Sequence, residues 1–182
     1  PIFNQGIVTQ NPNIWWDAFI KVCQNLKNNF DISIISKMSI NGTSGTVMLT
    51  NNDGRPLHDA IMYNDTSATE ESLLVEKISN NHPIVSSQGN ALVRVLKLIK
   101  MVNNIKSYKI LHQADWFVGK ITNNYSISDE NNSLKLGYDC INKNWPDWIS
   151  NLPIEISSLP IIYSPGELVS NLKNKELIDI GF

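Results

Sequence analysis

The chain has 182 residues, which is enough for one domain with a buried hydrophobic core. Its formal net charge of -2 gives no electrostatic basis for binding nucleic acid or an anionic membrane surface. No apolar run approaches the roughly 18 residues that a membrane-spanning helix needs, so neither nucleic acid nor a membrane is an expected partner.

The first predicted element is a helix that opens at Asn11-Pro12, with Asn11 as its cap and Pro12 in its first turn. Its apolar residues recur at helical spacing and predict one buried stripe: Trp15, Phe19, Val22 and Leu26. Cys23 lies beside this stripe and is expected to be a buried thiol. Cys23 and Cys140 form no CxxC motif, which argues against a metal or redox site, and two unpaired cysteines favour a cytoplasmic protein.

Strands are predicted next along the chain. Ile32 to Ile40 is rich in β-branched residues and is predicted to be a strand, with Thr46 to Thr50 as its hairpin partner. The stretch Asn51-Asn52-Asp53-Gly54 is a strong turn signal, because an Asp-Gly pair tolerates positive φ angles. A short third strand is predicted from Ala60 to Tyr63.

The second half of the chain is predicted to be mainly helical. Asp65 is expected to cap a helix from about Ser67 to Ile78. A second helix is predicted over 90–103, with Arg94 and Lys97 on its solvent-facing side. The remaining expected elements are a strand over 109–111, helices over 113–121 and 145–152, and a last amphipathic turn over 175–180. Strands that alternate with helices predict an α/β domain.

Several well-known catalytic motifs are missing from the sequence: a Walker loop, HExxH and GxGxxG. The stretch Gly42-Thr43-Ser44-Gly45 is one residue short of the GxSxG turn of serine hydrolases. A hydrolase that pairs Ser44 with His58, His82 or His112 is therefore not favoured, and each histidine is expected to have a structural role.

The most informative segment is Ile40-Asn41-Gly42-Thr43-Ser44-Gly45-Thr46, which lies between two predicted strands. It exposes two hydroxyl groups and several backbone N–H groups, which suits a polyol or a phosphate as ligand. An ordinary turn is the alternative interpretation of the glycines. The order of the surrounding motifs favours a binding site: Gln10-Asn11-Pro12-Asn13-Ile14-Trp15-Trp16 before the segment, then Asp53-Gly54-Arg55-Pro56-Leu57, Tyr63-Asn64-Asp65, and His112-Gln113-Ala114-Asp115-Trp116.

In this order the motifs resemble the N-terminal domain of FGGY carbohydrate kinases, which have a "QDPxxWW" helix, a glycine loop, "DGxPL" and "WND". Tyr63 stands here where the family usually has tryptophan. The Gly-Thr-Ser-Gly-Thr loop, together with Gln113 to Trp116 and Leu134-Lys135-Leu136-Gly137-Tyr138, is most similar to D-ribulokinase-type enzymes of cyanobacteria and plastids. The Gln-Met-His of the xylulokinase loop does not match Thr43-Ser44.

The resemblance implies a ribonuclease-H-like or actin-like fold over residues 1–182, and a sugar site in the cleft between two domains. Ser44 is the first candidate for contacting the sugar, with Thr43 and the Gly45 amide beside it. Asp65 is expected either to contact the sugar or only to cap its helix. Asp115 and Trp116 are expected to anchor their helix in the core.

The chain also departs from the family pattern. It lacks the N-terminal strands with the Asp-x-Gly-Thr-Ser-type phosphate loop, the catalytic aspartate and the nucleotide domain, so the fold is expected to be incomplete. The resemblance implies Mg-ATP as cofactor of the intact enzyme, with no catalytic, cofactor-binding or metal residue in this chain. The chain alone is therefore expected to be inactive.

The expected function is the sugar-binding part of an ATP-dependent ketose kinase, with D-ribulose as the favoured substrate. D-xylulose or another polyol is the alternative within this class. A relic of the fold that binds a sugar or a partner without catalysis is the alternative in another class. The expected partners are a ketose or polyol and the rest of a kinase chain, or a second copy through an exposed sheet edge.

Overall fold

The computed structural model of the chain describes residues 1–4, 6–103, 105 and 107–182. Its main sheet has the strand order β1-β2-β4-β3-β5 in this described part, and every pair of neighbours is antiparallel. The strands are β1 (Ile2–Asn4), β2 (Ile7–Gln10), β3 (Val47–Thr50), β4 (Ala60–Ile61) and β5 (Lys109–His112). A separate parallel pair joins β6 (Ile127–Asp129) to β7 (Ile161–Tyr163). The predicted α/β class is confirmed.

The helices mostly follow the sequence predictions. They are α1 (Asn13–Asn29), α2 (Thr69–Ile78), α3 (Ala91–Val102), α4 (Gln113–Thr122), α5 (Glu130–Ser133) and α6 (Lys175–Ile180). Short 3-10 helices cover Ile32–Ile34, Leu134–Leu136, Asp147–Asn151 and Ile156–Ser158. None of the described helices is long and apolar enough to cross a membrane.

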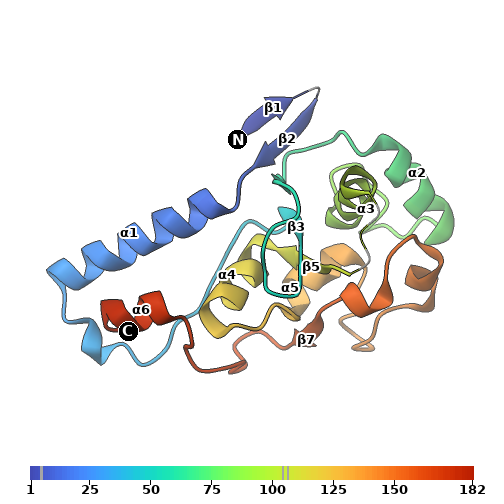
Figure 1. Cartoon of the computed structure of the whole chain (residues 1–182). Helices are drawn as coiled ribbons and strands as arrows, with labels where there is room; N and C mark the ends of the chain where they lie inside the picture. Colours follow the sequence, from blue (N-terminus) through green and yellow to red (C-terminus); the bar gives the residue numbers. More distant parts are fainter. Residues whose placement is uncertain (5, 104, 106) are drawn as a thin grey trace.

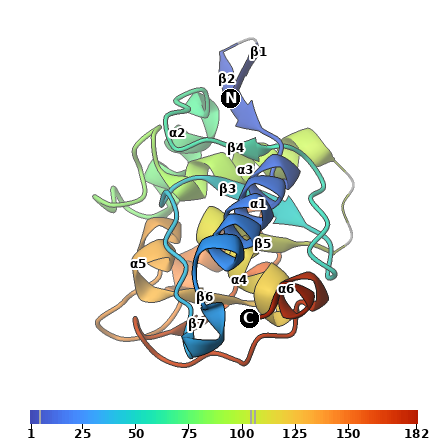
Figure 2. The ribbon, with the colours of Figure 1, turned by 90° about the vertical axis from the view of Figure 1, so that its left-hand side faces the viewer.

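The central strands separate two hydrophobic cores. Val47 and Leu49 of β3 face a core built with α2 and α3, whereas Met48 between them faces a core built with α1, α4 and α6. This alternation follows from the two-residue repeat of a strand. Figure 1 accordingly shows α1 and α6 on one side of β3 and β5, and α2 and α3 on the other. Figure 2 shows α1 crossing in front of these strands.

The predicted strand over 32–40 is wrong. A 3-10 helix occupies Ile32–Ile34, with the Asp31 carboxylate accepting the Ser33 N–H at 3.0 Å, and residues 35–42 form no strand. β-branched residues favour a strand only where a neighbouring strand pairs with them, and no described strand lies beside 35–40. The Ile34 side chain is 80% exposed as a result. The strand predicted at Thr46 to Thr50 is confirmed as β3, but its partners are β4 and β5.

The first helix is confirmed with a shifted stripe. Its buried residues are Trp16, Ile20 and Cys23, whereas Val22 is 63% exposed. Of the predicted stripe, Trp15, Phe19 and Leu26 are partly buried and pack against the same core, so the prediction is wrong only at Val22 and the centre of the buried face lies about one residue further along. Cys23 is a buried free thiol, as predicted.

The hairpin of β1 and β2 projects from the body of the molecule (Figure 1). β1 is an edge strand of the main sheet, and it exposes the Ile2 and Phe3 side chains. An edge strand with exposed apolar side chains is a surface on which a further strand pairs readily.

Candidate functional site

The loop over residues 41–46 lies between the extended segment 35–40 and β3, and it is closely packed on two sides. A Cβ atom on Gly42 would lie 3.0 Å from the backbone nitrogen of Ala114 at the start of α4. Gly45 has φ +92, and a Cβ atom there would lie 3.1 Å from Nη1 of Arg94. Both glycines are therefore required for the loop to approach its neighbours this closely.

Hydrogen bonds fix the loop to β4's end and to α4. The Thr43 N–H donates to Oε1 of Gln113 at 3.1 Å, and the Gln113 N–H donates to the Thr46 carbonyl at 3.1 Å. The Thr46 hydroxyl accepts the Tyr63 N–H at 3.1 Å. Within the loop, the Thr46 N–H donates to the Thr43 carbonyl at 3.2 Å. The loop is thus a hydrogen-bonded platform, built on the turn that the Thr46 to Thr43 bond closes and tied to α4 and to the residue Tyr63 after β4.

The side chain of Ser44 stands free on this platform. It is half-buried, and among the described hydrogen bonds none uses its hydroxyl. Ser44 lines a groove with a volume of about 1090 Å³, which segment 35–42, α4, α5 and residues 163–172 enclose. A hydroxyl in such a groove has one donor and two acceptor positions left for a ligand. Thr43 beside it is exposed.

The other two candidate residues lie deeper. Gly45 is buried, and its carbonyl accepts a hydrogen bond from Arg94 at 2.8 Å. The Asp65 side chain is fully buried and accepts the Val8 N–H at 2.7 Å and the Ser67 N–H at 3.0 Å. Asp65 does not cap α2 as predicted: the cap position is Ala68, which makes no side-chain cap bond. The carboxylate instead joins β2 to the segment that precedes α2.

Sequence reasoning missed Arg94. It was predicted to be solvated, but it is only 1% exposed and donates to the carbonyls of Gly45, Tyr63 and Asp65. Burial lowers the pKa of the guanidinium, and the negative charge of Asp65 acts in the opposite direction. The available signal was the composition of α3, which is apolar on nearly every face, as is typical of a buried helix. Lys97 was also predicted to be solvated, but it is half-buried and donates to the Ser67 carbonyl at 2.7 Å.

The wall of the groove at α4 holds a buried polar network. The Asp115 carboxylate accepts the His112 N–H at 2.9 Å and the Ser128 hydroxyl at 2.8 Å, and it faces the His112 ring nitrogen at 3.2 Å. Trp116 is buried and donates its indole N–H to the Gly54 carbonyl at 2.9 Å, so the predicted anchoring role of both residues is confirmed. No serine hydroxyl bonds to a histidine ring among the described residues, which argues against a serine hydrolase.

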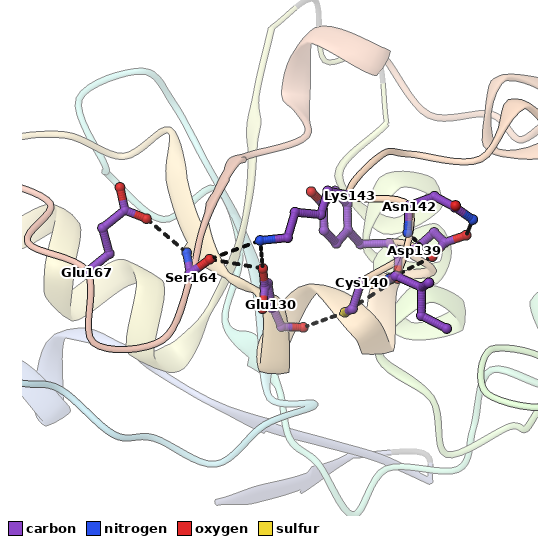
Figure 3. Close-up of polar contacts among 9 residues, drawn as sticks. Glu130, Asp139, Cys140, Asn142, Lys143, Ser164 and Glu167 are labelled. Atoms are coloured by element: carbon purple, nitrogen blue, oxygen red, sulfur yellow. Dashed lines mark hydrogen bonds and ion pairs between the residues drawn. The ribbon is translucent and has the colours of Figure 1, made fainter.

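A second polar cluster ties α5 to the segment after β7 (Figure 3). Glu130 accepts the Ser164 hydroxyl at 3.1 Å and lies 3.3 Å from the ammonium of Lys143. Glu167 accepts the Ser164 N–H at 3.2 Å. The neighbouring Cys140 donates to the Glu130 carbonyl, and burial together with nearby acidic groups raises the pKa of its thiol. This cluster therefore holds the outer wall of the groove and offers no activated nucleophile.

The carboxylates that line the groove are engaged within the protein. Asp115 is bonded as described, Asp129 accepts two hydrogen bonds from Asn132, and Glu167 accepts from Ser164. The described residues also contain no group of three or more acidic, histidine or cysteine side chains that could hold a metal ion. The groove thus presents hydroxyl and amide groups for binding, and among its carboxylates only the exposed Glu167 keeps an oxygen without a described partner.

Comparison with known proteins gives a consistent result. The sequence profile of the N-terminal domain of the FGGY family of carbohydrate kinases matches residues 2–182. The xylulose kinase of Staphylococcus xylosus is 22% identical over 182 aligned positions, which cover 93% of this chain and 38% of that enzyme.

Solved structures show the same fold. A xylulose kinase from Brucella ovis superimposes with a TM-score of 0.84 at 18% identity, over 95% of this chain and 38% of that one. A glycerol kinase from Plasmodium falciparum with ADP gives a TM-score of 0.84 at 19% identity, over 99% of this chain and 40% of that one. The chain therefore spans about two-fifths of the length of the proteins that it matches.

Proposed function

Because the chain belongs to the FGGY family of carbohydrate kinases, we propose that it forms the sugar-binding part of an ATP-dependent kinase for a ketose. Kinases of this family are phosphotransferases that act on sugars and related polyols. The chain spans only part of such a protein, so the activity of the whole protein and its substrate belong to the proposal.

The observation that carries the proposal is the free hydroxyl of Ser44 on a rigid loop at the groove. A sugar hydroxyl is both a donor and an acceptor, and a serine hydroxyl matches it in either role. Gly42 and Gly45 hold the loop close to its neighbours, so the hydroxyl needs little ordering when a sugar binds. Thr43, exposed on the same loop, carries a second hydroxyl just outside the residues that line the groove.

D-ribulose is our first choice of substrate, because the Thr43-Ser44 pair resembles the loop of D-ribulokinase-type enzymes. D-xylulose is the second, because the Staphylococcus xylosus and Brucella ovis relatives are xylulose kinases. The two sugars differ in the configuration of one hydroxyl, so a direct comparison of their affinities decides between them.

We further propose that the chain alone transfers no phosphate. A general base must be able to accept a proton from the attacking hydroxyl; Asp115 and Asp129 each accept hydrogen bonds on both carboxylate oxygens, and the remaining groove carboxylate, Glu167, lies exposed on the outer wall. The described residues contain no group of three or more acidic, histidine or cysteine side chains, and we assign no step of the reaction to Mg-ATP at residues of this chain.

The test is a calorimetric titration of the chain with D-ribulose, D-xylulose and glycerol, carried out on the wild type and on Ser44→Ala. Loss of one neutral hydrogen bond, worth about 1 kcal/mol, should weaken binding of the preferred ketose by about fivefold. Ser157→Ala is the matched control, because Ser157 is exposed and lies outside the groove. Equal affinities of the two variants, or a wild type that binds none of the sugars, would contradict the proposal.

A further inference from the structure

The guanidinium of Arg94 connects two segments that are distant in sequence. Its Nη1 donates to the Gly45 carbonyl at 2.8 Å, while Nε and Nη2 donate to the Asp65 carbonyl at 3.1 and 2.8 Å. Nη2 also donates to the Tyr63 carbonyl. We propose that Arg94 is the positioning residue of the sugar site, which sets the place of the Ser44 loop relative to segment 63–65. This inference rests on the proposed function.

An arginine suits this task better than any other side chain. Its planar group carries five N–H donors in a fixed geometry, whereas a lysine ammonium is a single point of charge on a flexible stem. Arg94 uses this geometry to reach three carbonyl groups at once. Its charge is buried, and charge-assisted bonds to these carbonyls compensate for the lost hydration.

The position of Arg94 relative to the loop explains why it matters for binding. Gln113 holds the loop at Thr43 and Thr46, but these bonds run to α4 and not to segment 63–65. The pairing of Val47 with Ile61 brings the two segments side by side, and two described side-chain groups then bond across: the Thr46 hydroxyl to the Tyr63 N–H, and the Arg94 guanidinium to the carbonyls of both segments. Ser44 immediately precedes the carbonyl that Arg94 holds. A binding group must be held to within about 0.5 Å of its place. Loss of the Arg94 contact should therefore displace Ser44 and lower the affinity for the sugar.

Lys97 provides a matched control on the same helix. It lies three residues after Arg94 on α3 and also bonds a cationic group to a backbone carbonyl, that of Ser67 at 2.7 Å. It has no described contact with the loop. A general weakening of α3 would therefore affect both variants, whereas a role in positioning the loop would affect only Arg94.

The experiment compares Arg94→Lys with Lys97→Met in the chain of 182 residues. Hydrogen–deuterium exchange is followed in the peptide that contains the loop, and D-ribulose and D-xylulose are titrated below the melting temperature of each variant. Arg94→Lys should speed exchange of the loop amides by about tenfold and weaken ketose binding by a similar factor. Lys97→Met should change both quantities by less than about twofold. Arg94→Met serves in place of Arg94→Lys if the lysine variant does not fold.

Two results would overturn the inference. One is that the loop amides of the Arg94 variant exchange at the same rate as those of the wild type. The other is a Lys97→Met variant that speeds exchange of the loop amides and weakens ketose binding as much as the Arg94 variant does. If the proposed function is wrong, the wild type binds neither ketose. The exchange rates still show in that case whether Arg94 holds the loop.

Discussion

Gly45→Ala is the substitution that tests the packing of the loop most sharply. Gly45 has φ +92, a conformation that costs an L-residue about 1–2 kcal/mol. The added methyl group would also lie 3.1 Å from Nη1 of Arg94, whose other nitrogen atoms are already held by carbonyls. Displacing this nitrogen weakens a buried charge-assisted bond, which adds about 1 kcal/mol. We expect a total loss of about 2–3 kcal/mol of unfolding free energy.

For a chain of this size, this loss corresponds to a melting temperature lower by about 5–10 °C, measured by circular dichroism. Gly166→Ala is the control: Gly166 has φ +83, but a Cβ atom there meets no described atom within 4 Å. It should show the backbone cost alone, about 1–2 kcal/mol. Gly45→Ala melting at or above the temperature of Gly166→Ala would refute the close contact between the loop and Arg94.

Three further predictions concern other parts of the molecule. Trp116→Phe should lower the unfolding free energy by about 1–3 kcal/mol in urea titrations, because the buried Gly54 carbonyl loses its donor; an unchanged midpoint would contradict the anchoring role. The wild type should self-associate through the β1 edge, and Phe3→Lys should shift it toward monomer in sedimentation velocity; identical profiles would exclude that edge. Burial raises the pKa of the Cys140 thiol above its ordinary 9.0, so less thiolate is present at pH 8. In a Cys23→Ser background, alkylation by iodoacetamide at pH 8 should therefore be slower in the folded chain than in urea; equal rates would argue against the raised pKa.

Periodicity and turn chemistry predicted most of the fold from the sequence. The helices α2 to α4 lie within two residues of their predicted ranges, and α1 begins within two residues of its predicted start, because each buries an apolar stripe at helical spacing. The prediction failed at 32–40. This segment is rich in β-branched residues, which favour strands, but no described strand pairs with it. Propensity alone does not fix an element whose stability depends on pairing with a distant segment.

The candidate site was predictable in part. The sequence singles out Ser44 and Thr43 because glycines around a polar pair mark a loop that approaches its neighbours closely, and the structure places Ser44 at the groove. Arg94 was not found, because a charged residue in a helix is solvated in most proteins, and its three carbonyl partners come from segments distant in sequence. The burial of Asp65 was also not predicted, because its partner Val8 lies in β2, distant in sequence.

The central claim is that the loop at 42–46 is the floor of a carbohydrate site. The most direct measurement is the change in backbone amide resonances of the ¹⁵N-labelled chain on addition of D-ribulose and, separately, of D-xylulose. The account predicts that the largest changes fall on Thr43 to Thr46 and on Gln113, whose side chain holds the loop. Saturable changes confined to another surface, such as the charged groove between α2 and α3 at Glu71 and Lys100, would contradict it.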